Sequence, residues 1–478
     1  QALETKESDS SDPATLQRVS GAMTSSTFPL VVVSNRLPVS FSVNESGAKV
    51  PTLSPGGLVA AVAPSLRGKN SAWVGWDGTD SGETDEFVAE DITLLPVSLS
   101  ASLVERHYVG FSNGTLWPLF HDVGVEPEFD PSWWEAYREV NATYAARAAE
   151  VTDPGGIVWV HDYQMMLVPA LLRKLRPDVT IGYFHHIPFC QPKTLAALPE
   201  HPQLLEGIAA ADIVGFQRDQ DRDNFRDAVR TAQLGPERAE TYPISLDFGA
   251  VSSAASDPAV RTRATALREE WGSPTTVFLG VDRIDYTKGI PERLEAFEGL
   301  LQSGRVSVED CVMVQAGSPS RENVPSYRAL RARIEGIVAR INSAFQSSGG
   351  RPAVVYTAQN LERAEMLALF VAADVMVVSS LRDGMNLVAK EFVACRNDDS
   401  GVLILSPFTG AADRMVDALI ADPTHQPDLE AAMVLAMGMT PAEQNKRMAA
   451  LREEVRSHDV AWWADQILGD LASLRSHP

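Results

Sequence analysis

Cysteine is scarce in this sequence. The 478 residues include three cysteines, Cys190, Cys311 and Cys395, which lie far apart and form no CxxC pair. Disulfide frameworks and structural zinc sites are built from more numerous or more closely spaced cysteines. Both are therefore disfavoured. Cys311 and Cys395 lie inside apolar segments, and we expect them to be unreactive thiols of the core.

Long hydrophobic runs and several familiar motifs are missing too. No run approaches the roughly 18 apolar residues of a membrane span. No charged-then-apolar N-terminal segment of the signal-peptide kind is seen, so we expect a cytoplasmic protein. The patterns G-x-G, GxxxxGK[ST] and HExxH do not occur. Their absence disfavours an enzyme that uses NAD or FAD, a P-loop kinase and a zinc hydrolase.

Basic residues are outnumbered by acidic ones. The chain has 41 Lys and Arg against 63 Asp and Glu, which gives a formal net charge of −22. Nucleic acids and anionic membranes bind proteins through an excess of Lys and Arg, so neither is an expected partner. If the substrates are anions, basic residues must be gathered locally at the site that binds them.

The pattern of apolar residues predicts an α/β protein. Residues 1–27 are polar and lack hydrophobic periodicity, which is typical of a mobile tail. Further along, short apolar runs without alternation indicate parallel strands that are buried on both faces. The predicted strands are Leu30–Ser34, Ala72–Trp76, Ile157–His161, Thr180–His185, Asp212–Phe216, Thr276–Val281, Cys311–Ala316, Ala353–Thr357, Asp374–Ser379 and Val402–Ser406. The predicted crossover helices are Val168–Leu175, Asp219–Ala232, Ile290–Leu301, Ser326–Phe345 and Arg363–Ala372.

The two series of strands predict two doubly wound domains. Between them, the segment Asp247–Val260 is small, polar and proline-containing, and is interpreted as the interdomain connection. A helical tail from about Thr440 to Leu474 has enough apolar residues to pack on a domain. Open parallel sheets bind ligands at the carboxyl ends of their strands, so the expected site is the cleft between the domains.

Two cations follow the predicted strand Thr276–Val281. Arg283 comes almost directly after it, and Lys288 precedes a helix that is expected to begin near Pro291. Two cations at a strand end, beside a helix N-terminus, suit a bound diphosphate. The alternative is ion pairing at the surface with the neighbouring aspartates at positions 282 and 285, and the local sequence leaves both interpretations open.

The segment Ser379–Glu391 is a second candidate for ligand binding. Gly384 permits close approach of the backbone, and a helix is expected to start at or just after Asn386, with its free N–H groups aimed at a ligand. Asp383 could accept hydrogen bonds from sugar hydroxyls, and Glu391 from both hydroxyls of a ribose. Equally, Asp383 or Asn386 could simply cap the helix and Glu391 could be solvated.

The first predicted domain has two further candidates, a glycine pair and polar residues at strand ends. Gly57 belongs to a glycine pair before a helix, which can cradle a phosphate, although a tight turn is the commoner explanation. Asp162 and His186 follow apolar strands and are expected to face the cleft, whereas His185 could simply be buried.

Two arginines and two aromatic residues complete the candidates. Arg36 follows the predicted strand Leu30–Ser34, and Arg321 follows the strand that begins at Cys311 by a short loop. Tyr108 and Trp117 lie in the segment HYVGFSNGTLWPLFH, where core packing is the default role of any one aromatic residue.

Together, these segments resemble the trehalose-6-phosphate synthases, retaining glucosyltransferases of glycosyltransferase family 20 with the two-domain GT-B architecture. The strings that carry the resemblance follow the family's order from about Leu30 to Arg396: SNRLPVSF, GGLVAAV, WVGWDG, GFSNGTLWPLFH, VWVHDYQ, YFHHIPF, GVDRIDYTKGIPERL, SRENVPSY and RDGMNLVAKEF. The chain departs from the family at Cys190, where proline usually follows HIPF, and at Gln164, where histidine is frequent. Neither position has an assigned role.

The resemblance implies a site for a nucleotide-glucose donor. Gly57, Arg283 and Lys288 would hold its diphosphate, and Glu391 its ribose. The donor glucose would be held by His186, Asp383 and backbone groups of the segment Gly384, Met385, Asn386 and Leu387, and Val388 would also belong to the donor site. Arg283, Lys288, His186 and Asp383 would be the catalytic residues.

The resemblance also implies a site for a phosphorylated acceptor. Arg36, Tyr108, Trp117 and Arg321 would bind its phosphate, and Asp162 its hydroxyls. Residues 28–248 would form a Rossmann-like acceptor domain and residues 249–455 a Rossmann-like nucleotide-sugar domain, with the active site in the cleft between them. Residues 456–478 would form a helix that crosses back to the first domain.

The implied reaction moves glucose from UDP- or ADP-glucose to glucose 6-phosphate with retention. Arg283 and Lys288 would stabilise the departing diphosphate in place of a metal, and a phosphate oxygen of that group would take the acceptor's proton. Neither a protein base nor a cofactor is then needed. A homo-oligomer is expected, as is a separate phosphatase that acts on the product.

Three rival functions stay open. They are a nucleotide-sugar epimerase, a polymerising transferase similar to glycogen synthase, and a sugar-nucleotide sensor without catalytic activity. Arg36 and Arg321 favour a phosphate-bearing acceptor, because a polysaccharide acceptor would not need them.

Overall fold

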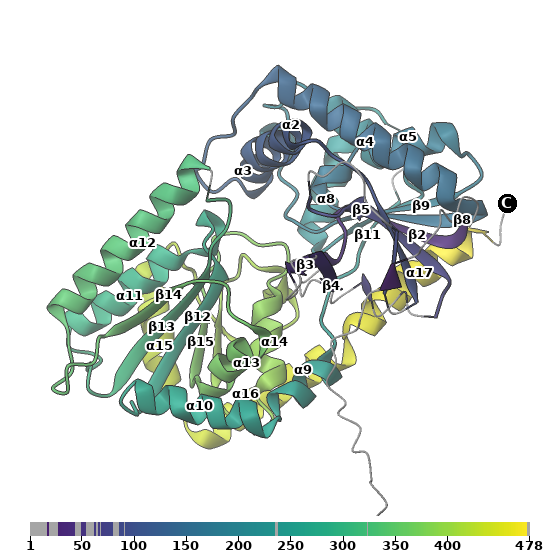
Figure 1. The fold of residues 1–478 in the computed structure, drawn as a ribbon. Helices are drawn as coiled ribbons and strands as arrows, with labels where there is room; N and C mark the ends of the chain where they lie inside the picture. The colour runs from purple at the N-terminus through teal and green to yellow at the C-terminus, as the bar shows by residue number, and fades with distance from the viewer. Residues whose placement is uncertain are drawn as a thin grey trace, which may run out of the picture.

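The computed structural model describes residues 17–18, 27–43, 49–53, 62–63, 66, 68–79, 86–89, 91–234, 238–322 and 324–475. They form two α/β halves, each built on its own sheet, and the carboxyl-terminal chain returns across the first half (Figure 1). Gly57 and most of the predicted N-terminal tail lie outside the described residues.

The first sheet has nine strands among the described residues, in the order β1-β6-β7-β5-β2-β8-β9-β10-β11. The first pairings at one edge, β1 with β6 and β6 with β7, are antiparallel, and every pairing from β7 to β11 is parallel. The strands are β1 (Gln17–Arg18), β2 (Phe28–Arg36), β5 (Ser71–Trp76), β6 (Phe87–Ala89), β7 (Ile92–Pro96), β8 (Thr152–His161), β9 (Thr180–His185), β10 (Ile213–Phe216) and β11 (Ala239–Thr241). A separate antiparallel hairpin joins β3 (Val39–Val43) to β4 (Lys49–Leu53).

The second sheet has six strands in the described part of the chain, and all of its pairings are parallel. Its order, β14-β13-β12-β15-β16-β17, is the 3-2-1-4-5-6 order of a doubly wound Rossmann sheet. The strands are β12 (Thr276–Arg283), β13 (Cys311–Ser318), β14 (Val354–Ala358), β15 (Val375–Val378), β16 (Val402–Leu405) and β17 (Leu419–Ile420).

Helices cover the sheets and supply the crossovers. In the first half they are α2 (Ala101–Leu103), the π-helix η1 (Val104–Leu116), α3 (Trp117–His121), α4 (Pro131–Val151), η2 (Tyr163–Met165), α5 (Val168–Leu175), α6 (Pro192–Leu195), α7 (His201–Ala209) and α8 (Asp219–Thr231). After it come α9 (Phe248–Ala255), α10 (Pro258–Glu270), η3 (Tyr286–Lys288), α11 (Ile290–Gln302), α12 (Pro325–Ala344), α13 (Arg363–Ala372), α14 (Leu387–Cys395), η4 (Gly410–Asp413), α15 (Gln426–Met437), α16 (Pro441–Ser457) and α17 (Val460–Arg475).

The continuous apolar runs of the sequence serve two cores at once. In β12, Val277 and Leu279 face the core that contains α13 and α14, whereas Phe278 faces the core formed by α11, α12 and α15. Side chains alternate between the faces of a strand, so a strand that is covered on both faces is apolar at every position. The predicted fold class is confirmed. Each predicted strand and crossover helix corresponds to an observed one, although β8 begins at Thr152 instead of Ile157.

The segment Asp247–Val260, interpreted as the interdomain connection, is mostly helical. Asp247 caps α9 by accepting a hydrogen bond from the Ala250 N–H at 2.8 Å, and Phe248 and Val251 are buried in the core beside the second sheet. The small residues of this segment hid a helical spacing of apolar side chains. The stretch without regular structure lies earlier, at residues 242–247.

The predicted single tail helix is two helices. The first ends at Ser457, and Asp459 caps the start of the second by accepting hydrogen bonds from the N–H groups of Ala461 and Trp462 at 3.0 and 3.1 Å. α17 then runs along the first sheet (Figure 1), where Trp463 packs on Trp159 with ring centroids 5.1 Å apart. The Val460 N–H bonds the Leu246 carbonyl at 3.0 Å, so the two connections between the halves lie side by side. Within the described residues, no helix is long and apolar enough to span a membrane.

Candidate active site

A cavity of about 290 Å³ lies between the two halves. Each sheet reverses its strand order beside its first parallel strand, β2 or β12, and doubly wound sheets bind ligands at this point, beyond the carboxyl ends of the strands. The cavity is lined by Asp162, His186, Gln217 and Ile244 from the first half and by Asp282, Arg283, Lys288, Asp383, Met385, Asn386, Leu387 and Val388 from the second.

The loop after β15 reaches across to the first half at Gly384. A Cβ atom at this position would lie 2.1 Å from the His186 carbonyl oxygen. On the other side of the loop, a Cβ at Gly410 would lie 2.1 Å from the Gly384 oxygen. Both approaches are closer than any side chain allows. Glycine is therefore needed at position 384 for the two halves to meet, and at position 410 for the two loops of the second half to pack together.

Replacing Gly384 with alanine should therefore force the halves apart. We expect kcat/KM to fall about 100-fold, because a displacement near 1 Å in a reacting geometry costs that much. The matched control is Gly336→Ala on α12, where an added Cβ meets nothing within 4 Å. That variant should keep full activity, and its melting temperature should rise slightly because alanine favours a helix. Equal activity of the two variants would contradict the close approach.

Lys288 and Asp383 form an ion pair in the cavity wall, with 2.5 Å between the Lys288 Nζ and the Asp383 Oδ2. Asn386 supports it by donating from Nδ2 to the same oxygen at 3.1 Å, while its own Oδ1 caps α14 by accepting from the Ala389 N–H at 3.0 Å. Burial opposes ionisation of Asp383, but the Lys288 cation more than offsets it, and the pKa of Asp383 lies below its ordinary value. Asn386 therefore caps the helix α14 and also supports the ion pair in the cavity wall.

His186 is held from both sides of its ring. Its Nε2 lies 2.9 Å from Nδ1 of His161, and its Nδ1 lies 3.5 Å from the amide nitrogen of Gln217. The orientation of that amide is fixed, because the Gln217 oxygen accepts the Ile244 N–H at 2.9 Å. Burial holds the pKa of His186 well below its ordinary value, so the imidazole is neutral. The neighbouring His185 is fully buried.

Asp162 occupies a strained position at the end of β8. Its φ of 76° lies in the left-handed region, and its Oδ1 accepts the His186 N–H at 3.1 Å. Burial raises the pKa of Asp162 to about 7. The carboxyl group is thus poised to gain or lose its proton near neutral pH.

This raised pKa predicts how stability depends on pH. The unfolded chain ionises Asp162 at its ordinary value of 3.8, but the folded chain does so at about 7. The stabilising contribution of the group is full below pH 3.8 and is lost as the pH rises to 7. Asparagine does not titrate, so the variant Asp162→Asn should not lose stability in this way. The unfolding free energy of the variant minus that of the parent protein should therefore increase between pH 4 and 7. The increase should be at most about 4 kcal/mol and smaller where water in the cavity screens the charge. Urea melts across this range would detect it, and a gap that does not change with pH would contradict it.

A second group of cations lies around Trp117. The guanidinium carbon of Arg321 is 4.1 Å from the centre of the indole, and that of Arg283 is 5.3 Å away. Arg321 is largely buried, with 9% of its side chain exposed, and it donates hydrogen bonds to the hydroxyls of Tyr327 and, at 3.3 Å, of Tyr163. This acidic chain therefore gathers cations at the junction of its halves, as binding of anions requires.

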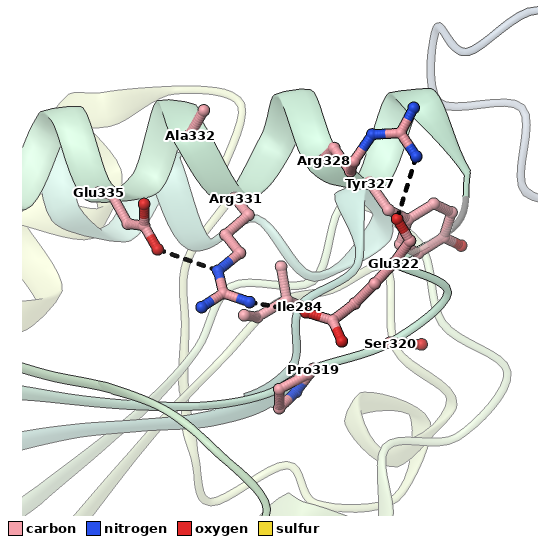
Figure 2. Close-up of a pocket in the computed structure, with 9 residues that line it drawn as sticks. All are labelled: Ile284, Pro319, Ser320, Glu322, Tyr327, Arg328, Arg331, Ala332 and Glu335. Carbon is pink, nitrogen blue, oxygen red and sulfur yellow. Dashed lines mark hydrogen bonds and ion pairs between the residues drawn. The ribbon is translucent and has the colours of Figure 1, made fainter.

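The loop that carries Arg321 is tied down on its outer side. Figure 2 shows Arg331 of α12 bridging Glu322 at 2.7 Å and Glu335 at 2.9 Å. Tyr327 lies on the first turn of the same helix and helps to line a hollow of about 290 Å³ there. Arg321 itself has a φ of 49°, which non-glycine residues rarely adopt. Its placement over Trp117 therefore depends on the contacts that hold the loop.

Three predicted residues lie outside the cavity lining, the loop at Gly384 and the group around Trp117. Arg36 is exposed at the end of β2, with its guanidinium carbon 5.7 Å from the centre of the Trp76 ring. Tyr108 lies half-buried in η1. Glu391 does not line the cavity. It pairs with Arg363 of α13 at 2.6 Å and has 18% of its side chain exposed.

The two aspartates beside Arg283, Asp282 and Asp285, are both buried. Asp285 lies 3.6 Å from Arg283 but is completely buried. Asp282 instead pairs with the buried Arg293 at 2.5 Å. The ion pair between Arg283 and Asp285 that the alternative interpretation named is therefore present, but its carboxylate is buried and does not lie at the surface.

Sequence reasoning missed Gln217 and the burial of Asp285. Gln217 follows β10 directly, so the rule that ligands gather at strand ends could have found it. No sequence signal predicted the π-helix η1, which leads into Trp117. Such turns are rare in proteins as a whole, but those that occur are often found at functional sites.

Comparison with known proteins gives a consistent result. The model of glycosyltransferase family 20 matches residues 29–473. A trehalose-6-phosphate synthase of Mycobacterium sp. (strain JLS) is 44% identical over 467 residues, which cover 93% of this chain and 96% of that protein.

Solved structures agree with this. A UDP-forming α,α-trehalose-phosphate synthase from Burkholderia xenovorans, in complex with glucose 6-phosphate, superposes with a TM-score of 0.85 at 30% identity, covering 93% of this chain and 99% of that one. A trehalose-6-phosphate synthase studied with bisubstrate glycomimetics, for glycosyl transfer with retention, has a TM-score of 0.84 at 32% identity and covers 93% of this chain and 99% of its own.

Proposed function

This chain belongs to glycosyltransferase family 20, and on that basis we propose that it is a trehalose-6-phosphate synthase that transfers glucose from a nucleoside diphosphate glucose to glucose 6-phosphate. The products are α,α-trehalose 6-phosphate and the nucleoside diphosphate. UDP-glucose is the first donor to test, because the B. xenovorans relative is described as UDP-forming. ADP-glucose is the alternative donor. A cytoplasmic location, a homo-oligomeric state and a separate phosphatase that consumes the product belong to the same proposal.

The observation that carries the proposal is the pair of guanidinium groups over Trp117. Arg283 ends β12 in the second half and borders the cavity, and Arg321 packs on the same ring. Two cations that share one aromatic ring suit two neighbouring anions. A donor diphosphate beside Arg283 and an acceptor phosphate beside Arg321 would bring the reacting sugars together.

The donor half of the proposal rests on fixed positive groups. Lys288 reaches the cavity from η3, and α14 begins at Leu387 with its free N–H groups directed toward the loop before it. Negative charge develops on the departing diphosphate, and cations that are already in place stabilise it without reorganisation. In this scheme they replace a metal ion, and no cofactor takes part.

The scheme also accounts for retention without a protein nucleophile. A double displacement would need a free carboxylate close to the anomeric carbon. Asp383 is neutralised by Lys288 at 2.5 Å, and Asp162 is engaged by the His186 N–H at 3.1 Å. We therefore propose that the acceptor attacks from the face that the diphosphate leaves. Its proton passes from the hydroxyl oxygen to a phosphate oxygen of the leaving group as the new C–O bond forms and the old one breaks.

A donor panel tests the function. The purified chain is incubated with UDP-, ADP- or GDP-glucose, with and without glucose 6-phosphate, and the release of nucleoside diphosphate is followed. We expect release to require glucose 6-phosphate, to be fastest with one donor and to be unaffected by a chelator. Proton NMR of the product should show two α-anomeric signals.

Each rival function gives a different outcome in this panel. A sensor would release no nucleotide, an epimerase would convert UDP-glucose to its galactose isomer without release, and a polymerising enzyme would respond to glycogen. Any of these results would replace the proposal.

A further inference from the structure

Asp285 is a completely buried carboxylate that the proposed reaction does not use. We propose that Asp285 is a positioning residue that holds Arg283 and Arg321 at a fixed separation, and so sets the spacing between the donor diphosphate and the acceptor phosphate. The inference rests on the proposed function and names one determinant of its preference for a phosphorylated acceptor.

The contacts of one carboxylate oxygen support this role. The Asp285 Oδ2 lies 3.6 Å from the Arg283 Nη2 and 3.7 Å from the Arg321 Nη1. The same oxygen accepts the hydroxyl of Tyr327 at 3.1 Å, and that hydroxyl in turn accepts a hydrogen bond from Arg321. One oxygen atom thus links the cation expected at the donor to the cation expected at the acceptor.

The other oxygen anchors the carboxylate itself. The Asp285 Oδ1 accepts the backbone N–H and the hydroxyl of Thr287 at 3.1 and 3.0 Å, which caps the 3₁₀ turn η3. Lys288 is the last residue of that turn. Asp285 is therefore fixed relative to all three cations, and its side chain cannot rotate away without breaking the cap.

Charge explains why a carboxylate is needed at this position. The guanidinium groups of Arg283 and Arg321 both pack on the Trp117 ring, with their carbons 5.3 and 4.1 Å from its centre. Like charges in a poorly solvated site repel each other strongly. Burial alone would raise the pKa of Asp285, but the nearby cations outweigh it and lower the pKa to about 2. The group stays ionised at every working pH and offsets the repulsion when no substrate is bound.

Stability alone is a poor explanation for this arrangement. Buried ion pairs are often no more stabilising than apolar residues of similar size, because both partners lose their hydration. A buried carboxylate between two arginines that are proposed to bind anions is better explained by the placement of those arginines.

The variant Asp285→Asn tests the proposal. It keeps the shape of the side chain and the oxygen that caps η3, but removes the charge. The readout is the ratio of kcat/KM for glucose 6-phosphate to kcat/KM for glucose. Effects on donor binding cancel in this ratio, so it reports only the recognition of the acceptor's phosphate. We expect the ratio to fall by about 10- to 50-fold, in line with the loss of a charge-assisted contact. The Kd of UDP, measured alone by calorimetry, should rise severalfold.

A double variant separates positioning from general damage. If Asp285 acts through Arg321, Asp285→Asn combined with Arg321→Ala should have the same ratio as Arg321→Ala alone. Tyr327→Phe removes the shared hydroxyl but keeps the charge, and should lower the ratio by a smaller factor. It carries the test if Asp285→Asn does not fold.

Asp374→Asn is the structural control. Asp374 pairs with Arg268 at 2.8 Å, away from the cavity, and its loss should lower the melting temperature without changing the ratio. A parent-like ratio in both Asp285→Asn and Tyr327→Phe would overturn the inference. Failure of the proposed function would look different, because the parent protein would then show no preference for glucose 6-phosphate.

Discussion

Replacing Lys288 with alanine should lower kcat about 100- to 1,000-fold, the usual effect of removing one preorganised group that stabilises charge in a transition state. Lys288 lines the cavity and its Nζ is fixed 2.5 Å from the Asp383 carboxylate. A cation held in this way needs no rearrangement when the diphosphate departs. The KM of the donor should change much less than kcat, because charge on the diphosphate grows mainly as the bond breaks.

The same substitution should also move the acid limb of the pH–rate profile. Lys288 is the main reason why the pKa of Asp383 lies below its ordinary value despite burial. Without the cation, burial dominates and the pKa of Asp383 rises. Activity that needs the Asp383 carboxylate would then decline at a higher pH than in the parent protein.

Steady-state kinetics with saturating glucose 6-phosphate measures both effects. The matched control is Lys446→Ala on α16, which removes the same charge from an exposed position. It should have parent-like kcat and KM. A Lys288 variant with unchanged kcat and a raised donor KM would show that the lysine contributes uniform binding and would contradict a role in the transition state.

The architecture could be predicted from sequence because its signal is local. A strand such as β9 is buried at all six positions, and that requirement appears directly as an unbroken apolar run. Short edge elements escaped notice, since β11 has three residues and β17 has two. The helix α9 was not predicted, because serine and alanine occupy most of its positions and its burial depends on contacts with a core that lies elsewhere in the chain.

The site was predictable in its location but not in its pairings. Residues at strand ends, such as Asp162 and Arg283, come together because parallel strands end at the same edge of each sheet. Lys288 and Asp383 are 95 residues apart in sequence, and nothing local indicates that they form an ion pair. The same holds for Glu391, whose partner Arg363 lies on a different helix.

Replacing Arg321 with alanine should raise the KM of glucose 6-phosphate about 10- to 150-fold, with a smaller change in kcat. Hydrogen bonds to charged groups contribute roughly 1.5–3 kcal/mol each, and this range of energies corresponds to that range of binding constants. The guanidinium is held ready for an anion by stacking on Trp117 at 4.1 Å and by the hydroxyls of Tyr163 and Tyr327. The effect on unphosphorylated glucose as acceptor should be small, because that substrate offers the arginine no charge.

Arg333→Ala is the control for this prediction, since Arg333 lies on α12 with 53% of its side chain exposed and pairs with Glu295. It removes one positive charge from the same half of the molecule and should leave both acceptors unaffected. The comparison separates a local phosphate contact from a general loss of positive potential, which would weaken both variants alike and depend on salt. Normal saturation by glucose 6-phosphate in Arg321→Ala would remove the arginine from the acceptor site. The phosphate would then have to be bound elsewhere at the junction, and Arg36, exposed at the end of β2, would be the first residue to substitute.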